Sequence, residues 1–548
     1  VLFKQMLKML SLDFICNYDS LILKDTKKIN KLAFALDMAV AGRSDESVWI
    51  RQAQEIRKQM TDSLIDSAFT YLPEGVKHDE IELIKQKLKR RRLELEAVAS
   101  QYYRLLQRTP VVAGTNQSDY FLIERQAPDR TILRIYDPET GDCRLEQQFS
   151  GKETKELWLY GLAGNDTFEV KGNTRKDFPI YLISGEGENQ YQLNHSRKIH
   201  VYDKDYKYDY QKIKYHKISF TPWGIYDSDK GISLGTFFTY TMYGFKRAPF
   251  TYQHRIGYNY LKGFMYAGVF PNYDGRRRLY LNASISSPRN FENFFGFGNN
   301  TAGYKEEKKN YNRVKLRTYM FNPSFEMDLR KEEVMTFFGS LDMYKAKRTD
   351  DRYIYTVYGE DHPIFRTNYF VGLGATYRIT KQPYSWLPLL ETEWTAGWKM
   401  NLKKPERNFP YAQGSLSWNV RFSDRFTWAS LMKGTVLFDN DYEFYQAATI
   451  DLRGFRDNRF IGKQSFYQYS DLRLDMGKLK NPFTPLKYGL FAGFDYGRVW
   501  FPGERSHSWH TSYGGGIWLT FLNKFTTKYS WFGSTDSFRF AFELGLGF

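Results

Sequence analysis

Cysteine is nearly absent from this chain of 548 residues, because only Cys16 and Cys143 occur. Two cysteines cannot form the disulfide framework that holds small secreted domains together, and the sequence leaves open whether they pair. Long hydrophobic runs are missing as well, since no apolar stretch reaches the ~18 residues that a membrane-spanning helix requires. The sequence therefore predicts neither a disulfide-rich fold nor a transmembrane helix.

The short motifs of common catalytic sites are also missing. No Gly-x-Ser-x-Gly elbow, His-Glu-x-x-His zinc motif or Walker loop occurs. The closest histidine pairs, His195/His200 and His507/His510, each lack a third ligand and are interpreted as surface residues, the second pair in an outer loop. We therefore expect no enzyme activity in this chain, no cofactor and no catalytic residue.

Aromatic residues are abundant, with 42 Tyr and 44 Phe, although the mean hydropathy is −0.58. A polar average with many aromatics fits a membrane barrel whose strands alternate apolar and polar residues. The net charge of +17 is compatible with nucleic-acid binding or with a basic lumen and rim facing anionic lipid head groups. We favour lipid over nucleic acid. The chain begins at Val1 without a signal peptide, so we expect a fragment of an exported precursor.

The end of the chain alternates strictly between two kinds of residue. Side chains of a strand point alternately to opposite faces. One face would carry Phe538, Phe540, Phe542, Leu544, Leu546 and Phe548, and the other Arg539, Ala541, Glu543, Gly545 and Gly547. An aromatic face of this kind is typical of a lipid-facing barrel strand.

A second feature precedes this strand: Leu452-Arg453-Gly454-Phe455, followed some forty residues later by Asp495 within Gly493-Phe494-Asp495-Tyr496-Gly497-Arg498-Val499-Trp500. Together with the terminal strand, these pieces resemble the BamA-like superfamily of outer-membrane assembly and translocation barrels, the bacterial surface-antigen family. The resemblance implies a lumen loop that carries Arg453 to Asp495 on the inner wall. A charge-assisted pair suits a confined lumen. We expect Phe491 and Phe494 to frame the pair, and an exchange of the two charges to restore part of the stability that Arg453→Ala would remove.

The resemblance also implies a fold, a function and a location. We expect a mainly β protein with a 16-stranded antiparallel transmembrane β-barrel, and the length from about Pro222 to Phe548 suits that number. The terminal strand would be a sorting signal. The barrel would act in insertion or translocation of outer-membrane or secreted proteins, alone or inside a larger assembly complex. It would lie in the bacterial outer membrane with its N-terminal part in the periplasm. Its partners would be outer-membrane lipid, lipopolysaccharide and other envelope assembly proteins.

Three regions follow from the patterns along the chain: a helical segment over residues 1–108, a small β-rich periplasmic domain over 109–215, and the barrel over 216–548. Helices are expected over residues 28–41, 45–70 and 81–105. The third has a basic face that suits lipid or an acidic partner, but a solvated face balanced by Glu94 and Glu96 is favoured. The expected barrel strands include 231–245, 277–285, 369–379, 389–400, 412–422, 488–500 and 513–521. Hairpin turns are expected at 273–276 and 522–524.

Two segments of the β-rich region resemble each other at an offset of 23 residues, namely 157–168 and 180–191. Each is a strand, a glycine-rich turn and a strand, which predicts stacked β-coils or a small sandwich. The first copy partly matches a calcium-binding nonapeptide, with Leu162 in place of a glycine, and makes Asn165 and Asp166 candidate calcium ligands. Tight turns explain the same glycines and are favoured, because Ca²⁺ requires six to eight oxygens.

The arrangement departs from BamA-like proteins in one respect: no run of periplasmic β-α-α-β-β modules precedes the barrel. It is similar instead to the C-terminal part of fusion proteins in which a metallophosphoesterase precedes such a barrel. The similarity rests on Tyr102-Tyr103, Val112-Ala113-Gly114-Thr115, residues 159–168 and residues 293–301. The metal-binding motifs of that enzyme are not in this chain. The alternative function is therefore a membrane anchor for a catalytic domain upstream, which leaves the full precursor's enzyme activity open.

Overall fold

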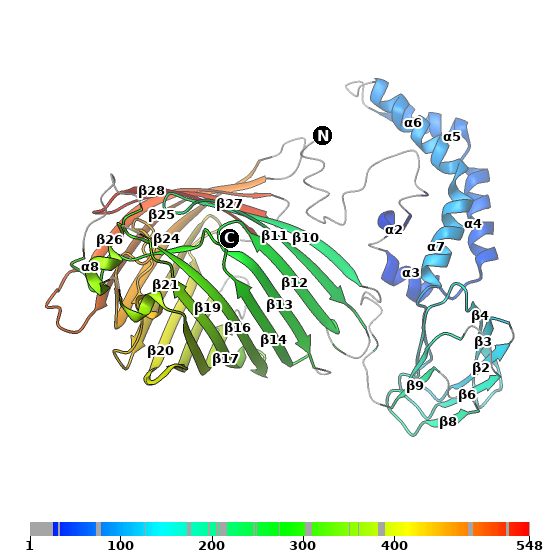
Figure 1. Cartoon of the computed structure of the whole chain (residues 1–548). Helices are drawn as coiled ribbons and strands as arrows, with labels where there is room; N and C mark the ends of the chain where they lie inside the picture. Colours follow the sequence, from blue (N-terminus) through cyan, green and yellow to red (C-terminus); the bar gives the residue numbers. More distant parts are fainter. Residues whose placement is uncertain are drawn as a thin grey trace. The chain divides into compact units, whose positions relative to one another are not determined.

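A computed structural model of the chain divides into two compact units (Figure 1). The first contains residues 1–216 and 242–250, and the second contains residues 217–241 and 251–548. The structure describes the chain apart from residues 1–22, 24–25, 31–32, 73–77, 127, 173–176, 195–197, 204–207, 209–215, 245–246, 248, 273–274, 302–309, 350, 360, 382–388, 480–485, 522–524 and 547–548. Both expected hairpin turns, at 273–276 and 522–524, fall wholly or partly outside the described residues.

The first unit begins with helices that are shorter than the sequence pattern suggested. They are α2 (Thr26–Ile29), α3 (Phe34–Val40), α4 (Glu46–Gln59), α5 (Asp62–Ala68), the 3₁₀ turn η2 (Phe69–Tyr71), α6 (His78–Leu93) and α7 (Leu95–Leu106). The expected helix over 45–70 is split because the Thr61 side chain accepts a hydrogen bond from the backbone N–H of Leu64 and so caps a new helix. In the described part of the chain, no helix is long and apolar enough to cross a membrane.

Nine strands follow and form two sheets. They are β1 (Val111–Ala113), β2 (Tyr120–Gln126), β3 (Arg130–Tyr136), β4 (Cys143–Ser150), β5 (Leu157–Tyr160), β6 (Thr167–Gly172), β7 (Ile180–Ile183), β8 (Gln190–Leu193) and β9 (Ile199–Tyr202). One sheet has the order β1-β5-β7-β9 and is parallel; the other has the order β4-β3-β2-β6-β8. Leu157 pairs with Ile180 and Thr167 with Gln190, so the two similar segments stack in register. The stacked arrangement predicted from the 23-residue offset is present.

The parallel sheet has a core on each face. Leu157, Leu159 and Leu182 face the second sheet and pack with its buried residues, among them Phe121 and Phe168. The alternate residues of the same strands face the helices, where Trp158, Tyr160 and Ile183 pack with Phe34, Met38, Tyr102 and Leu106. The boundary expected at residue 108 thus lies between α7 and β1, two elements that contribute to one core.

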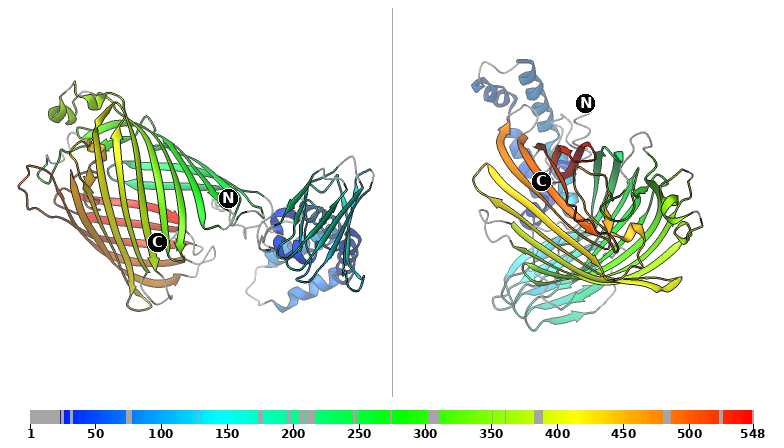
Figure 2. Two further views of the ribbon diagram at one scale, coloured as in Figure 1. Left: turned by 90° about the horizontal axis from the view of Figure 1, so that it is seen from below. Right: turned by 90° about the vertical axis from the view of Figure 1, so that its left-hand side faces the viewer.

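The second unit is a closed antiparallel barrel (Figure 2). Its strands are β10 (Lys217–Asp227), β11 (Gly231–Met242), β12 (Tyr252–Asn259), β13 (Gly263–Pro271), β14 (Arg277–Ile285), β16 (Arg313–Arg330), β17 (Glu333–Ala346), β18 (Asn368–Lys381), β19 (Leu389–Asn401), β20 (Lys404–Arg421), β21 (Phe426–Leu437), β24 (Gln464–Leu479), β25 (Leu486–Trp500), β26 (His510–Phe521), β27 (Phe525–Gly533) and β28 (Phe538–Leu546). The short β15 (Phe291–Asn293) pairs with β16 beside this ring. The predicted 16-stranded antiparallel barrel is confirmed.

Residues alternate along each barrel strand between the lumen and the outside. Side chains with large exposed apolar surface point outward, for example Phe321, Leu373 and Trp394, which are 40%, 62% and 60% exposed. Buried acidic residues such as Asp342, Asp471 and Asp495 lie on the opposite faces of their strands. The wall therefore has the apolar exterior and polar interior of a barrel that fits a lipid bilayer.

Candidate functional site

The candidate site is built by the connection between β21 and β24, residues 438–463, which we call the lumen loop. It contains a 3₁₀ turn, η5 (Phe444–Gln446), and the two paired segments β22 (Ala448–Thr449) and β23 (Ile461–Gly462). Its apolar residues Ile450, Leu452, Phe455 and Phe460 are each no more than 3% exposed. They form one cluster with Tyr467 of β24 and Val499 of β25. The loop is therefore packed against the inner wall of the barrel.

Arg453 is held at the tip of this loop by two carboxylates of the wall. Its Nη2 lies 2.5 Å and its Nε 3.1 Å from Oδ1 of Asp495, and its backbone N–H donates to Oδ2 of Asp495 over 3.0 Å. Its Nη1 lies 2.6 Å from Oδ1 of Asp471 on β24. The Ser512 hydroxyl donates to Asp495 as well, over 2.7 Å. The predicted contact between Arg453 and Asp495 is present, and Asp471 is a second partner that the sequence did not suggest.

Two aromatic rings of the wall complete the contact with Arg453. The guanidinium carbon lies 4.0 Å from the centre of the Phe532 ring and 5.3 Å from that of Tyr469. Phe491 is buried on the same face of β25 as Asp495 and contacts Phe532. Phe494 was expected to frame the pair but is 50% exposed, because neighbouring residues of a strand point to opposite faces. The frame around Arg453 therefore consists of Phe532 and Tyr469, supported by Phe491, and the expectation for Phe494 is wrong.

Gly454 allows the loop backbone to approach the wall closely. A Cβ atom at this position would lie 2.6 Å from Cβ of Ser512 and 2.8 Å from the carbonyl oxygen of Gly533. The Ser534 hydroxyl donates to the carbonyl oxygen of Gly454 over 2.7 Å. A side chain larger than hydrogen would push Arg453 away from its carboxylates, so the glycine has a steric reason to be here.

The other two arginines of the lumen loop bind the hairpin turns on either side of the place where the barrel closes. Arg456 Nη1 lies 2.5 Å from Oδ1 of Asp229, in the β10–β11 turn. Arg459 forms an ion pair with Asp536, in the β27–β28 turn. Lys230 adds a contact to Asp457 of the loop at 2.6 Å. We call these three pairs the clasp, because one loop holds the first and the last hairpin together.

A further segment, residues 291–300, supports the lumen loop. Phe294 and Phe295 follow β15 and are fully buried. The Asn293 side-chain amide donates to the carbonyl oxygen of Asp457 over 3.1 Å. The backbone N–H of Gly298 donates to the carbonyl oxygen of Ile461 over 2.8 Å. The run of aromatic, glycine and asparagine residues in 291–300 was a signal for a packed segment, because exposed loops rarely carry several phenylalanines.

The histidine expected on the surface of an outer loop is also packed into this site. His510 begins β26, and its ring lies 3.5 Å from the ring of Phe460, nearly parallel to it. One ring nitrogen of His510 lies 3.2 Å from the side-chain oxygen of Asn299. His507 is exposed, as expected. In the described parts of the chain, no group of three His, Cys, Asp or Glu side chains is arranged to hold a metal ion.

The barrel closes through a short seam between β10 and β28. Among the described residues, four pairs join these strands, from Gly224 opposite Leu544 to Asp227 opposite Ala541. By comparison, β10 pairs with β11 over eleven positions and β28 with β27 over nine. In the same described part of the chain, positions 218–223 of β10 pair with β11 and not with β28. Arg539 of β28 donates from Nε to the Ser228 hydroxyl over 3.1 Å, beside the clasp.

The terminal strand has the alternation that the sequence suggested, as far as the structure describes it. Phe538 is 70% exposed, and Arg539 is 7% exposed on the opposite face. Phe540 contacts Trp531, and Phe542 contacts Tyr529 of the neighbouring strand. Leu544 pairs with Gly224. Leu546 ends the strand, and Phe548 lies outside the described residues. Its role as a sorting signal stays a prediction.

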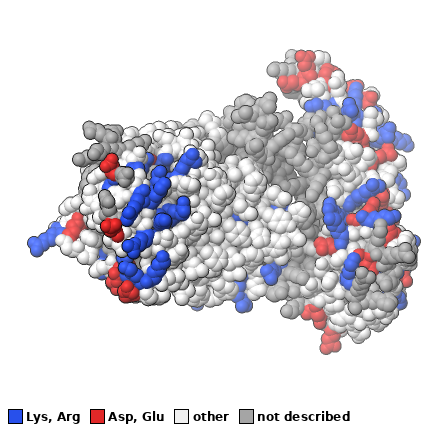
Figure 3. Space-filling model, viewed as in Figure 1, with Lys and Arg blue, Asp and Glu red and all other residues white. Residues whose placement is uncertain are grey.

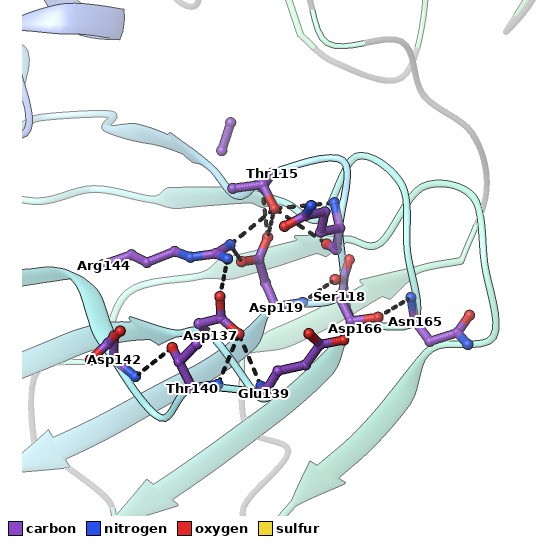
Figure 4. A network of polar contacts seen from close by, with 12 residues as sticks. Thr115, Ser118, Asp119, Asp137, Glu139, Thr140, Asp142, Arg144, Asn165 and Asp166 are labelled. Carbon is purple, nitrogen blue, oxygen red and sulfur yellow. Dashed lines mark hydrogen bonds and ion pairs between the residues drawn. The ribbon is translucent and has the colours of Figure 1, made fainter.

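The candidate calcium ligands of the first unit lie in a stack of three turns (Figure 4). Asp166 Oδ1 accepts a hydrogen bond from the backbone N–H of Asp119 over 2.9 Å. Asn165 accepts one from the backbone N–H of Glu188 over 2.9 Å. Arg144 binds Asp119 at 2.8 Å. One side-chain oxygen each of Asn165 and Asp166 thus joins successive turns, which favours the structural interpretation of the motif over a calcium site.

The same stack shows how Leu162 can replace a glycine of the nonapeptide motif, and it contains a third copy of that motif. Leu162 has a φ of 80° and Gly185, 23 residues later, has a φ of 82°, so the leucine adopts a backbone conformation that normally requires glycine. The third copy runs from β1 to β2, where Val112 pairs with Leu159 and Phe121 with Phe168. It was missed because its turn, Gly114 to Asp119, lacks the second glycine.

Asp166 is fully buried within this stack, and its Oδ2 accepts no hydrogen bond within the described residues. Burial raises the pKa of Asp166 to about 7, and the backbone N–H of Asp119 opposes that shift. The carboxyl group is therefore neutral in the folded unit under mildly acidic conditions.

No family model matches the chain, and a search of curated protein sequences found no match. The search of solved structures found similar barrels at low identity. BamA from Haemophilus ducreyi, lacking POTRA domains 1–3, is similar with a TM-score of 0.44 and 11% identity over 61% of this chain and 70% of that chain. CdiB from Escherichia coli has a TM-score of 0.42 and 11% identity, covering 60% and 62%. CdiB from Acinetobacter baumannii has a TM-score of 0.38 and 12% identity, covering 61% and 66%.

Proposed function

We propose that this chain is an outer-membrane barrel that inserts or translocates proteins through an opening at the β10–β28 seam, in a larger assembly complex. The observation that carries the proposal is the short seam itself. Each backbone hydrogen bond contributes about 1 kcal/mol net, and each unsatisfied group facing lipid costs several times more. Four paired positions therefore make this junction easier to separate than those on either side of it.

The part of β10 beyond the seam offers a route for a client protein. Among the described residues, 218–223 present an edge that can accept an added strand through main-chain hydrogen bonds. An edge of this kind inside a membrane is unfavourable unless another strand covers it. A client strand would meet that need, and its pairing would help to open the seam. The resemblance of the lumen loop and terminal strand to BamA-like barrels supports the same function.

We further propose an orientation from the lengths of the connections. The longest connections, including 347–367 and 438–463, lie at one end of the barrel, and the described connections at the other end include the short turns 331–332 and 422–425. Outer-membrane barrels have long outer loops and short periplasmic turns. The chain enters β10 from the short-turn end, so residues 1–216 would lie in the periplasm. Catalysis has no part in this proposal.

A disulfide across the seam tests the proposal. In a Cys16→Ser, Cys143→Ser background, Ile225→Cys with Glu543→Cys places two thiols on directly opposed residues of β10 and β28. Oxidation should lower the outer-membrane levels of client proteins about as far as depletion of the chain does, and a reductant should restore them. The matched control joins β27 to β28 through Ser530→Cys and Ala541→Cys, which are also directly opposed.

The control should support normal client levels when oxidised. Equal client levels in both locked variants would show that the seam does not open during function. Unchanged levels of all outer-membrane proteins after depletion of the chain would rule out the assembly function altogether.

A further inference from the structure

Four cationic side chains lie close together on the outer face of β16 and β17, at the end of the barrel that carries the connections 347–367 and 438–463. They are Lys315, Arg317, Lys345 and Lys347, and all four are exposed. Arg317 is directly opposite Lys345, and the backbone N–H of Lys347 donates to the carbonyl oxygen of Lys315 over 2.9 Å. Figure 3 shows Lys and Arg gathered at this end of the barrel, near α8 (Ile354–Tyr358). We call these four residues the cationic patch.

The cationic patch has no explanation in the stability of the barrel. Like charges on directly opposed residues of two strands repel each other. In the described part of the chain, none of the four side chains forms a hydrogen bond or ion pair, and no Asp or Glu shares their face at this end of β16 and β17. Within the described residues, the four adjacent cations therefore have no carboxylate to balance them, and an anionic ligand would supply that charge.

Below the cationic patch, the same faces of the two strands are apolar. Tyr319, Phe321 and Phe325 continue the outward face of β16, and Leu341 and Phe337 that of β17, each between 40% and 51% exposed. The side chains thus pass from a phenylalanine-rich band to a tyrosine and then to the cations. This is the order in which a lipid leaflet passes from acyl chains to its charged head groups.

Neighbouring strands show the same pairing of a tyrosine with a cation at this level. The Lys403 ammonium lies 5.1 Å from the centre of the Tyr369 ring, and the Arg289 guanidinium lies 4.2 Å from that of Tyr260. Tyr369 is directly opposite Met343 on β17, and Lys403 follows β19. Tyrosine and cation thus occur together at this level on strands beside the cationic patch as well.

We propose that the cationic patch binds the phosphorylated head group of a membrane lipid, whose acyl chains lie along the apolar band below. The proposal rests on the membrane location given under the proposed function and adds a ligand that this location does not specify. Arginine can hold two phosphate oxygens at once, and each lysine supplies a mobile positive charge. Two phosphate groups would match the four cations in charge.

Native mass spectrometry of the full chain in a neutral detergent tests the proposal, with the bisphosphorylated glucosamine lipid of the outer leaflet as the probe. Lys315→Gln, Arg317→Gln, Lys345→Gln and Lys347→Gln together should weaken binding at least about tenfold. The matched control removes four exposed cations at the other end of the barrel, at the start of β14 and the end of β16, through Arg276→Gln, Arg277→Gln, Arg330→Gln and Lys331→Gln. It has the same change in net charge and should bind within about twofold of the unchanged chain.

Two further measurements separate the lipid from other ligands and from misfolding. Lys345→Arg keeps the charge and should retain binding, and heat-dependent mobility in SDS should show that every variant is folded. The same lipid without its phosphates should bind at least about tenfold more weakly. Equal binding of that lipid, equal loss of binding in both quadruple variants, or full competition by inorganic phosphate at the lipid's own concentration would overturn the proposal.

The outcome is independent of the assembly function. Loss of lipid binding in the patch variant is measured without a client protein, so it supports the patch even if depletion leaves client levels unchanged. Conversely, lowered client levels on depletion with no lipid bound to the unchanged chain would overturn the patch and leave the assembly function in place.

Discussion

At the scale of single residues, the contacts of Arg453 depend on the number and geometry of its hydrogen-bond donors. One guanidinium and one backbone N–H reach Asp495 and Asp471 together, and Phe532 lies against its face. Asp495 is fully buried. A lysine carries the same charge but cannot span both carboxylates or stack on the ring. The position therefore requires the shape of arginine as well as its charge.

Arg453→Ala should destabilise the lumen loop, because it leaves two buried carboxylates without their main partner. The cost of breaking such a pair is about 3–5 kcal/mol. The temperature at which the barrel loses its resistance to SDS should fall clearly, and Arg453→Lys should recover only part of the loss. The control is Arg348→Ala, whose ion pair with Asp361 is exposed and is worth less than about 1 kcal/mol. Similar shifts for Arg453→Ala and Arg348→Ala would contradict this view of the loop.

Exchange of the charges of Arg453 and Asp495 was expected from the sequence to restore part of the stability that Arg453→Ala removes. The structure leads us to expect that this exchange does not restore stability. Asp495 accepts hydrogen bonds from the backbone N–H of Arg453 and from the Ser512 hydroxyl. An arginine at position 495 has no acceptor for these donors and is too large for a fully buried site. The structure therefore revises that expectation.

At the scale of elements, the lumen loop joins parts of the barrel that β-pairing alone joins poorly. The seam has four paired positions, and the clasp ties the turns on both sides of it. Asp229 has no exposed side-chain surface and receives contacts from both Arg456 and Asn293. We infer that the loop stabilises the closed seam, so movement of the loop and separation of the seam are linked.

Arg456→Gln with Arg459→Gln should therefore loosen both hairpins at once. Hydrogen exchange should rise about tenfold or more at the backbone amides of 224–233 and 530–541, since opening would lose two ion pairs with buried members. Amides of β18 and β19 should be unchanged. The matched variant changes Arg421→Gln at the end of β20 and Arg425→Gln in the short turn that follows, at the other end of the barrel, and should leave both hairpins as they were. Faster exchange in only one hairpin would show that the loop does not link them.

At the scale of the whole molecule, the two units have separate cores and should unfold separately. The cores of the first unit contain the stacked strands and the helices, whereas the second unit is held by its strand pairing and the lumen loop. In the described part of the first unit, Asp166 is a fully buried carboxyl group whose pKa burial raises to about 7. Asp166 should therefore make the stability of the first unit depend on pH.

Calorimetry of the full chain in detergent should show a first-unit transition that moves to lower temperature as the pH rises from about 4 to about 7. Over this range the unfolded chain has lost the proton, since the ordinary pKa of Asp166 is 3.8, whereas the folded unit keeps it until its pKa of about 7. The loss is at most about 1.4 kcal/mol per pH unit and ends above pH ~7.

Asp166→Asn should remove this contribution and stabilise the first unit at neutral pH, with no effect on the barrel transition. Glu139→Gln, in the same group of turns but exposed, serves as the control and should keep the original pH dependence. An Asp166→Asn variant with an unchanged pH dependence would mean that the carboxyl group is ionised in the folded unit.

Local patterns in the sequence were enough to predict several of the barrel strands. β14 (Arg277–Ile285) was predicted residue for residue, and β19 and β25 within two residues, because alternation and turn residues are properties of neighbouring positions. The pairing of Arg453 with Asp495 was predicted because the two short motifs that contain these residues resemble those of BamA-like barrels. The error at Phe494 was avoidable, since period-two alternation places it opposite Asp495.

Other contacts could only be decided by closure of the barrel. Arg453 and Asp471 are 18 residues apart, Arg459 and Asp536 are 77 apart, and Arg456 and Asp229 are 227 apart. No local pattern links such positions, because the shear and twist of the closed sheet determine which side chains meet in the lumen. The sequence by itself determined which residues face inward and where the chain turns. The tertiary structure decided which inward-facing charges pair, since many pairings satisfy the same pattern and the closed barrel permits one of them.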